Sequence, residues 1–333
     1  MKQARSKQFD VVTVGAATRD MFVKSRHFER RSDTRAPDGF DTWLPMGAKI
    51  PVDELVFETG GGATNAAVTF ANFGLKTACV TRVGQDPGGH EILDQLKRQK
   101  IAILGVQVDR KERTAYSIIL LSGSGSRAIL VSRGAAQNLD ARAMPWDKLP
   151  SRWLYVTSLA GNEKLLTQIF EQAKLGHRRV AWNPGNGEIE LGSKKLLPQL
   201  MQSDVLILNR EEAAALAGKS PRDLLGILKI LGPLPRLCLI VTDGKHGAYV
   251  HARGSTWFAA PQKTKVLNTT GAGDAFGSAF LAALLKDGDI KTGLRAATLN
   301  AGGVVSHMGA KAGILAKYPN QRMLSRIKIK QIA

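Results

Sequence analysis

The chain has 333 residues, of which 44% are hydrophobic and 6% aromatic, and its 47 Lys and Arg against 28 Asp and Glu give a formal net charge of +19. This length and apolar content predict one large α/β domain with a sizeable core and exclude a disordered chain. No apolar run reaches the roughly 18 residues that a membrane span needs. The polar, basic start "MKQARSKQF" does not resemble a signal peptide. We therefore expect a soluble, cytoplasmic protein without a membrane partner.

The cysteines and the positive charge bear on whether the chain holds a disulfide or metal site and whether it binds nucleic acid. Cys79 and Cys238 lie inside β-like runs, which predicts buried, reduced thiols and no disulfide or metal site. The net charge would attract a polyanion such as RNA. However, the densest basic clusters resemble solvated arms, and we find no stripe of interleaved aromatic and basic residues that could stack nucleobases. We therefore do not expect nucleic acid to be the main partner, and a catalytically idle RNA-binding protein is kept as the alternative from a different class.

Strands and helices alternate along most of the chain. In the predicted strands apolar residues recur at every second position or form short continuous runs, whereas in the predicted helices they recur every three to four residues. The predicted strands are 9–17, 76–84, 152–158, 178–184, 203–209 and 237–244, and the predicted helices are 63–74, 88–100, 163–176, 210–218, 220–231, 271–286 and 290–305. Repeated β-α-β order predicts a mostly parallel sheet that is covered by helices on both faces.

Two segments depart from this alternation. Residues 18–58 contain no convincing helix, and residues 101–132 have the pattern of consecutive antiparallel strands with turns at "DRKER" and "SGSGS". Together they predict one small sheet that projects from the main domain. A long segment of this kind inside a compact domain is commonly a lid over a site.

The stretch "NTTGAGDAFGSAF" at 268–280 is the strongest local signal for chemistry. Gly271, Ala272 and Gly273 expose backbone N–H groups at the start of a predicted helix, where the helix dipole also favours an anion. Asp274 follows in the first turn. A carboxylate beside a bound phosphoryl group would repel it, but it could accept a proton from an attacking hydroxyl. An isolated acid here would only compensate the dipole, whereas the bare Gly-Ala-Gly favours a catalytic base.

Other glycine motifs are absent. The stretch "AAALAGKS" at 213–220 has Ala213 in place of the first glycine of a Walker A loop and reads as the end of a helix, and no GxGxxG is present. These observations exclude a P-loop protein and a Rossmann cofactor site.

Four motifs in order resemble those of the PfkB (ribokinase-like) carbohydrate kinases. "NTTGAGDAF" is similar to their C-terminal signature, "TGGGATNAAVTFANFGLKTACVTRVGQDPGG" to their N-terminal signature, "NREE" to N-x-x-E, and "VTDGKHGAYV" to T-x-G-x-x-G. The resemblance covers roughly 9–315. It implies a ribokinase-like three-layer α/β/α fold with a mostly parallel central sheet plus a small β-sheet lid. It also implies a single kinase domain over 1–333, with lid segments at about 18–58 and 101–132.

The resemblance also implies a role for each matching residue in an ATP- and Mg²⁺-dependent phosphotransfer. Asp274 is the expected general base, and Gly271, Ala272 and Gly273 form the expected anion hole. The other expected site residues are Asp20, Gly60, Gly61 and Asn65 for the substrate, Asn209 and Glu212 for Mg²⁺ through water, and Thr242, Gly244, Gly247 and Asn300 for ATP.

The sequence departs from the family pattern at two places. Asn268 replaces the first Asp of the C-terminal signature, a position associated with a monovalent cation in part of the family. In "AWNPGN", Asn183 remains from the family's Asp-x-Asn-x-Arg, but Ala181 replaces the acid and the Arg is missing. At these two places the resemblance therefore does not support potassium activation or a contact role for Asn183.

The acceptor is left open between several small molecules. A primary hydroxyl of a sugar is the first expectation, and a nucleoside is the alternative. Arg19 or Arg133 could supply a cation for a sugar phosphate, and Phe22, Trp43 or Tyr116 could stack a nucleobase. The resemblance further implies a homodimer, because members of the family often pair their lids.

Overall fold

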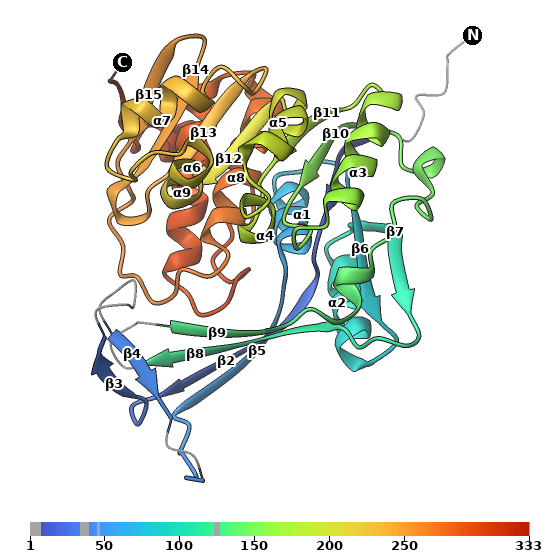
Figure 1. Ribbon diagram of the computed structural model, residues 1–333, viewed down its shortest axis with the longest axis vertical. Helices are drawn as coiled ribbons and strands as arrows, with labels where there is room; N and C mark the ends of the chain where they lie inside the picture. Colours follow the sequence, from blue (N-terminus) through green and yellow to red (C-terminus); the bar gives the residue numbers. More distant parts are fainter. Residues whose placement is uncertain (1–7, 34–39, 45–46, 123–126, 333) are drawn as a thin grey trace.

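A ten-stranded sheet forms the centre of the computed structural model, which describes residues 8–33, 40–44, 47–122 and 127–332 (Figure 1). Seven of its strands are parallel neighbours: β7 (Ala102–Asp109), β6 (Thr77–Gly84), β1 (Phe9–Val14), β10 (Ser151–Val156), β11 (Arg179–Trp182), β12 (Val205–Asn209) and β13 (Cys238–Thr242). Three antiparallel strands complete one edge: β14 (Ala248–Ala252), β15 (Ser255–Ala259) and β16 (Ile329–Gln331).

Helices cover both faces of this sheet. Its strands accordingly bury the side chains that point to either face. In β12, Leu206 and Leu208 join one core cluster while Val205 and Ile207 join the other. The first cluster contains residues of α3 (Glu163–Leu175), α5 (Ser193–Gln202), α6 (Arg210–Ala217) and α7 (Leu224–Leu231). The second contains residues of α1 (Gly62–Asn72), α8 (Ala272–Asp287) and α9 (Ile290–Val305). The short helices are α4 (Asn186–Ile189) and α10 (Gln321–Leu324). The predicted three-layer α/β/α architecture is confirmed.

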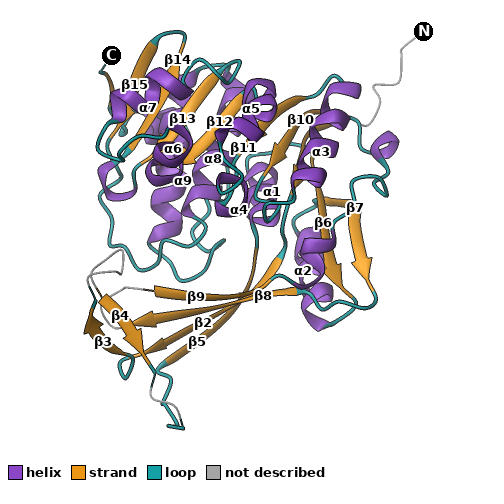
Figure 2. Cartoon of the chain, viewed as in Figure 1, coloured by secondary structure: helices purple, strands orange, loops and turns teal. Residues whose placement is uncertain are grey.

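A separate small sheet projects from one side of the molecule (Figure 2). Its strand order is β5 (Glu54–Gly60), β2 (Thr18–Ser25), β8 (Ala115–Ser122) and β9 (Arg127–Ser132), and a two-stranded ribbon of β3 (Glu29–Ser32) and β4 (Phe40–Trp43) lies beyond it. Phe22, Ile119 and Leu121 form a core of their own under this sheet. The helix α2 (Pro87–Arg98) packs beside α1 near the root of the small sheet.

The prediction of consecutive antiparallel strands over 101–132 is wrong in two respects. First, β7 joins the central sheet, where it pairs in parallel with β6. Second, β8 pairs in parallel with β2, and its antiparallel partner is β9. A strand-turn-strand pattern is the same in sequence whether its strands pair with each other or with distant partners, so turn signals alone could not resolve this pairing. The predicted "SGSGS" turn lies mostly at 123–126, outside the described residues.

Two smaller expectations can also be compared with the structure. Cys79 and Cys238 are both buried free thiols, as predicted. Across the described ranges, we find no helix with the length and apolar character needed to cross a membrane.

Candidate active site

A groove of about 290 Å³ lies along the carboxyl edge of the parallel strands. Open α/β sheets generally bind ligands at this edge, because the loops that leave the strands diverge there. The lining residues follow β1, β10, β11, β12 and β13 or begin α8, and they include Ala16, Thr157, Ser158, Asn183, Asn209, Glu212, Thr242, Gly271, Gly273 and Asp274.

The start of α8 has the geometry of an anion cradle. Gly271 has a φ of 79°, and a Cβ there would lie 2.5 Å from the carbonyl oxygen of Ala310, so only glycine fits. The reason for Gly273 is different, because a Cβ at that position would have no atom within 4 Å beyond its chain neighbours and the backbone of its own helix, among the described residues. Gly273 therefore leaves open space at the helix N-terminus, beside the first backbone N–H groups, where an anion can approach.

Asp274 lies in the first turn of α8 and is held from α1. The Asn65 side-chain amide donates a hydrogen bond from Nδ2 to Asp274 Oδ2 over 2.8 Å. Burial raises the pKa of the Asp274 carboxyl, while the hydrogen bond from Asn65 and the nearby Lys311 ammonium act in the opposite direction. A carboxylate with a raised pKa and a fixed orientation suits a general base.

The residues expected to hold the acceptor are also together. Asp20 is buried in β2 and accepts a hydrogen bond from Thr18 Oγ1 over 2.7 Å, and its burial raises the pKa of its carboxyl. A Cβ on Gly60 would lie 1.8 Å from Asp20 Oδ2. Gly61 has a φ of 92°, and a Cβ there would lie 2.4 Å from the Ala16 carbonyl oxygen. These glycines let the turn from β5 into α1 pass directly against Asp20 and the end of β1.

Asn209 and Glu212 face the groove from the junction of β12 and α6. They cap this helix reciprocally: Glu212 N–H donates to Asn209 Oδ1 over 2.8 Å, and Asn209 N–H donates to Glu212 Oε2 over 2.8 Å. Burial raises the pKa of the Glu212 carboxyl. One carboxylate and one amide are hard oxygen donors that suit a Mg²⁺ ion which keeps most of its waters. Among the described residues, no group of three or more His, Cys, Asp or Glu side chains is arranged to hold a metal ion directly.

The expected ATP residues divide into two groups. Thr242 lines the groove at the end of β13, and Gly244 and Gly247 follow in the turn to β14 with φ angles of 50° and 109°. The expected contact of Asn300 with ATP is wrong. Asn300 is fully buried, and its amide donates to the Ala275 carbonyl over 2.9 Å and accepts from Leu315 N–H over 2.9 Å, so its polar atoms serve the packing of α8 against α9.

The two positions that depart from the family pattern have local partners. Asn268 is buried, accepts from Thr270 N–H over 3.0 Å and donates to the Gly309 carbonyl over 3.5 Å. Asn183 lines the groove and donates from Nδ2 to the Ile207 carbonyl over 3.1 Å.

Two residues offered for alternative acceptors point elsewhere. Arg19 forms a salt bridge of 2.8 Å with Glu91 on α2 and has a side chain that is 11% exposed. Phe22 is fully buried in the core under the small sheet. Neither is free to meet a ligand, because one belongs to an ion pair and the other to the core. Trp43 and Tyr116 remain exposed.

Glu188 is a site residue that the sequence analysis missed. This fully buried carboxylate in α4 accepts hydrogen bonds from Ser158 Oγ, from the backbone N–H groups of Leu159, Gly161 and Gly185, at 2.7–3.0 Å. It thereby shapes the loops after β10 and β11 that line the groove. A lone Glu in "GNGEIEL" carries no sequence signal that distinguishes it from a solvated helical acid.

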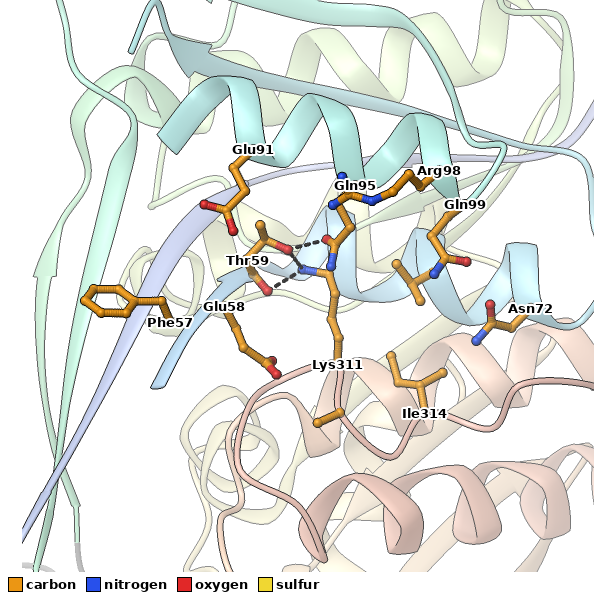
Figure 3. Close-up of a pocket in the computed structure, with 12 residues that line it drawn as sticks. Phe57, Glu58, Thr59, Asn72, Glu91, Gln95, Arg98, Gln99, Lys311 and Ile314 are labelled. Atoms are coloured by element: carbon orange, nitrogen blue, oxygen red, sulfur yellow. Dashed lines mark hydrogen bonds between the residues drawn. The ribbon is translucent and has the colours of Figure 1, made fainter. Parts of the chain in front are cut away.

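Lys311 is the second missed residue. It lies in the loop after α9, and its ammonium donates to the Thr59 carbonyl over 2.6 Å and to Thr59 Oγ1 over 3.0 Å (Figure 3). Burial lowers its pKa to about 8, against the opposing effect of Asp20, Glu58 and Asp274. Lys311 also lines a second cavity of about 450 Å³ between β5, α1 and α2.

This fold and site define the class of protein. A helix N-terminus that is open to an anion, beside a fixed carboxylate and at the ligand-binding edge of a parallel sheet, is an arrangement that suits phosphoryl transfer. The chain belongs to the pfkB family of carbohydrate kinases, whose profile matches residues 33–317. The resemblance expected from the four motifs is therefore confirmed, and so is the expected class of phosphotransferase.

Similar proteins include kinases with different acceptors in their names. The chain is 25% identical over 68% of its length to probable fructokinase-6 of Arabidopsis thaliana, of which it spans 62%. It is 26% identical to a nucleoside kinase of Methanothermobacter thermautotrophicus, covering 77% of this chain and 81% of the relative. It is also 26% identical to the ribokinase of Schizosaccharomyces pombe, covering 92% and 94%.

A solved structure supports the fold. The Arabidopsis thaliana ribokinase complexed with ribose and ATP superposes with a TM-score of 0.75 at 20% identity, covering 96% of this chain and 98% of that one.

Proposed function

We propose that this protein is an ATP- and Mg²⁺-dependent kinase that phosphorylates a primary hydroxyl of a sugar, with Asp274 as the general base. The observation that carries this proposal is the position of Asp274. Its carboxylate is held by Asn65 from the acceptor side and stands in the first turn of α8, next to the open space at Gly273. Base and anion cradle are therefore neighbours on one helix, where the attacking oxygen and the phosphoryl group must meet.

The chain's own residues account for the main steps. The acceptor hydroxyl loses its proton to Asp274 as its oxygen bonds to the γ-phosphorus, and the bond from that phosphorus to the bridging oxygen breaks to release ADP. The N–H groups of Gly271, Ala272 and Gly273 would stabilise charge on the transferred group. Asp20, Gly60, Gly61 and Asn65 would bind the other hydroxyls, since carboxylate and amide groups accept and donate several hydrogen bonds at once.

The nucleotide and the metal fit the rest of the groove. We infer that ATP lies along the carboxyl edge toward Thr242, Gly244 and Gly247. Asn209 and Glu212 would hold Mg²⁺ through water, and the ion would neutralise charge on the phosphates. The open position at Gly273 and the oxygen donors that face the groove support this fit.

A nucleoside acceptor is the second candidate. It is favoured by the nucleoside kinase of Methanothermobacter thermautotrophicus among the relatives and by the ring of Trp43, which is 49% exposed. Tyr116 is less suitable, because it pairs with Arg19 and therefore lies on the face of the small sheet opposite Asp20. A sugar phosphate is disfavoured as acceptor. Three carboxyl groups, Asp20, Glu58 and Asp274, interact with the single ammonium of Lys311, so the excess negative charge would repel a phosphate group.

The location and assembly of the protein are further parts of the proposal. We expect a cytoplasmic homodimer in which the small sheet acts as a lid and pairs with its copy. The idle RNA-binding alternative would require binding to RNA that falls steeply with salt and no turnover.

Coupled ADP release across ribose, fructose, fructose 6-phosphate, adenosine, cytidine and inosine tests the function. Turnover of one uncharged acceptor, with an absolute requirement for Mg²⁺, supports it. ATP binding without turnover of any acceptor, together with salt-sensitive RNA binding, would favour the idle alternative.

A further inference from the structure

The loop after α9 touches both halves of the proposed site. On the cradle side, Gly271 packs so closely on Ala310 that a Cβ would lie 2.5 Å from the Ala310 carbonyl oxygen. On the acceptor side, Gly309 has a φ of 109°, and a Cβ there would lie 2.1 Å from Glu58 Oε2. This loop is therefore wedged between the start of α8 and the end of β5.

Lys311 makes the hydrogen bonds that connect this loop to β5. Its ammonium donates to both the carbonyl and the hydroxyl of Thr59, which use two of its three N–H groups (Figure 3). Thr59 directly precedes Gly60 and Gly61, the glycines expected to meet the acceptor, and its hydroxyl donates onward to Gln95 of α2. The position of the acceptor turn thus depends on Lys311.

Lys311 is also the cation of an otherwise acidic group. Asp20 on β2, Glu58 on β5 and Asp274 on α8 all interact with it electrostatically, as does the buried thiol of Cys79 on β6. Register pairs Asp20 directly with Glu58, which places two carboxylates side by side across neighbouring antiparallel strands. Burial raises the pKa of the Glu58 carboxyl, and Lys311 acts in the opposite direction.

Asp274 itself has four polar or charged neighbours to consider. Asn65 from α1 donates a hydrogen bond, Lys311 supplies a positive charge, and Asp20 from β2 a negative one. The fully buried hydroxyl of Tyr155 on β10 is affected by the Asp274 charge and does not ionise near neutral pH, because burial raises its pKa well above the usual value. Lys311 is the one cation among these neighbours.

We propose that Lys311 is a positioning residue for the kinase reaction: it fixes the end of β5 beside Asp274 and supplies the counter-charge that keeps the Asp274 carboxylate ionised. The proposal rests on the function proposed above. Without this cation, three carboxylates, of which Asp20 is buried and Glu58 and Asp274 are partly buried, would stand close together, and Asp274 would retain its proton to higher pH.

The Lys311→Met variant, which keeps the length of the side chain but not its charge, tests the proposal. We expect the acid limb of its pH profile of kcat to move upward by about 1 pH unit, the lower end of the effect of one nearby opposite charge. The affinity for ATP should stay within about 2-fold, because Lys311 does not line the nucleotide groove. Lys311→Arg should restore the acid limb, and Lys317→Met, at an exposed lysine of the same segment, should match the wild type.

A second measurement separates this inference from the proposed function. The titration of Asp274 can be followed by ¹³C NMR in wild-type and Lys311→Met protein, whether or not an acceptor is turned over. An unchanged midpoint overturns the role of Lys311. A wild-type protein that phosphorylates no acceptor while its Asp274 midpoint still moves in Lys311→Met would instead overturn the proposed function. If Lys311→Met does not fold, a shifted acid limb in Lys311→Arg, which keeps the charge, overturns the proposal, and an unshifted one supports it.

Discussion

Asn65 and Asp274 lie 209 positions apart in the sequence, yet the amide of one donates to the carboxylate of the other over 2.8 Å. Asn65 belongs to α1, directly after the glycines that border Asp20, and Asp274 belongs to α8, directly after the glycines of the anion cradle. This one contact therefore joins the proposed acceptor-binding and phosphoryl-binding halves of the site. A displacement of either helix would therefore change this hydrogen bond and the orientation of the Asp274 carboxylate.

The Asp274→Asn variant should lose kcat by about 10²–10⁴-fold, the usual contribution of a general base, because an amide cannot accept the hydroxyl proton. ATP binding should persist, as measured by calorimetry. Asp94→Asn, at an exposed carboxylate of α2, is the matched control and should leave kcat unchanged. Loss of ATP binding together with activity in Asp274→Asn would mean that Asp274 is structural.

The pH dependence of kcat follows from the same carboxyl. If Asp274 is the general base, as proposed, its active form is the carboxylate, so activity should be present above the pKa of Asp274 and should be lost as pH falls through that pKa. Burial raises this pKa, and the hydrogen bond from Asn65 lowers it. In Asn65→Leu the lowering effect is removed, so the acid limb of kcat should move to higher pH. A pH profile measured at saturating acceptor checks this, and a limb that moves to lower pH contradicts it.

Much of the arrangement of the candidate site could be predicted from the sequence because its residues are close together in the chain. The cradle and Asp274 occupy four consecutive residues at one helix start, and Asn209 and Glu212 share one capping turn, so motif spacing is enough to bring them together. The order of strands and helices likewise predicted the parallel sheet, since a βαβ unit has few ways to pack.

The failures have a common physical cause, which is dependence on distant partners. Asn300 matches a family position, but its amide is hydrogen-bonded to the carbonyl of Ala275 and the N–H of Leu315. These partners are distant in sequence and are known only from the folded structure. Turn residues do not encode the partners of a strand, so the sequence pattern assigns β7 to the small sheet, whereas it pairs with β6 in the central sheet. Lys311 and Glu188 act through long-range contacts with β5 and with the loops after β10 and β11, so neither carried a local motif.

The two cradle glycines should respond differently to alanine. Gly271→Ala forces a positive φ and a close contact with Ala310, so it should destabilise the protein by about 1–3 kcal/mol. Gly273→Ala meets no atom and should leave stability unchanged or raise it by up to about 1 kcal/mol. It should still lower kcat/KM for ATP by about 10-fold or more, because the methyl group occupies the space next to the anion-binding amides. Urea denaturation and steady-state kinetics measure both effects, and full activity in Gly273→Ala would rule out the cradle.

Replacement of Glu188 should be costly to stability. In Glu188→Leu, the Ser158 hydroxyl and the N–H groups of Leu159, Gly161 and Gly185 lose their shared acceptor in a buried place. Each unsatisfied buried group costs about 1–3 kcal/mol, so we expect a loss of about 3 kcal/mol or more in the free energy of unfolding. Glu190→Leu, two residues on and exposed, is the control and should change it by less than about 0.5 kcal/mol. Equal stability of the two variants would show that the Glu188 contacts contribute little.

The acid side of the stability curve should reveal Asp109. Its carboxylate accepts from the backbone N–H groups of Lys111 and Glu112 and from Arg82, and these hydrogen bonds lower its pKa to about 2. Because the folded pKa lies below the usual 3.8, its stabilisation is fully present above that value and is lost as pH falls toward 2. The difference in unfolding free energy between wild type and Asp109→Asn should therefore be constant at neutral pH and shrink below about pH 4. A difference that grows on acidification would contradict the assignment.

The small sheet presents an apolar row that we expect to be covered in a homodimer. Phe57, Met21, Ile118 and Leu130 are successive cross-strand partners over β5, β2, β8 and β9, and Phe57 and Leu130 are 50% and 56% exposed. Side chains in register across four strands form one continuous surface, and exposed apolar surfaces of this kind mark interfaces. Light scattering should give twice the chain mass of 35.9 kDa for the wild type and the single mass for Phe57→Glu. Leu175→Glu, at a leucine of α3 that is 74% exposed and lies outside the small sheet, should remain dimeric. A wild-type protein that is monomeric at micromolar concentration would exclude this interface, whereas a dimer that survives Phe57→Glu would locate the interface on another surface.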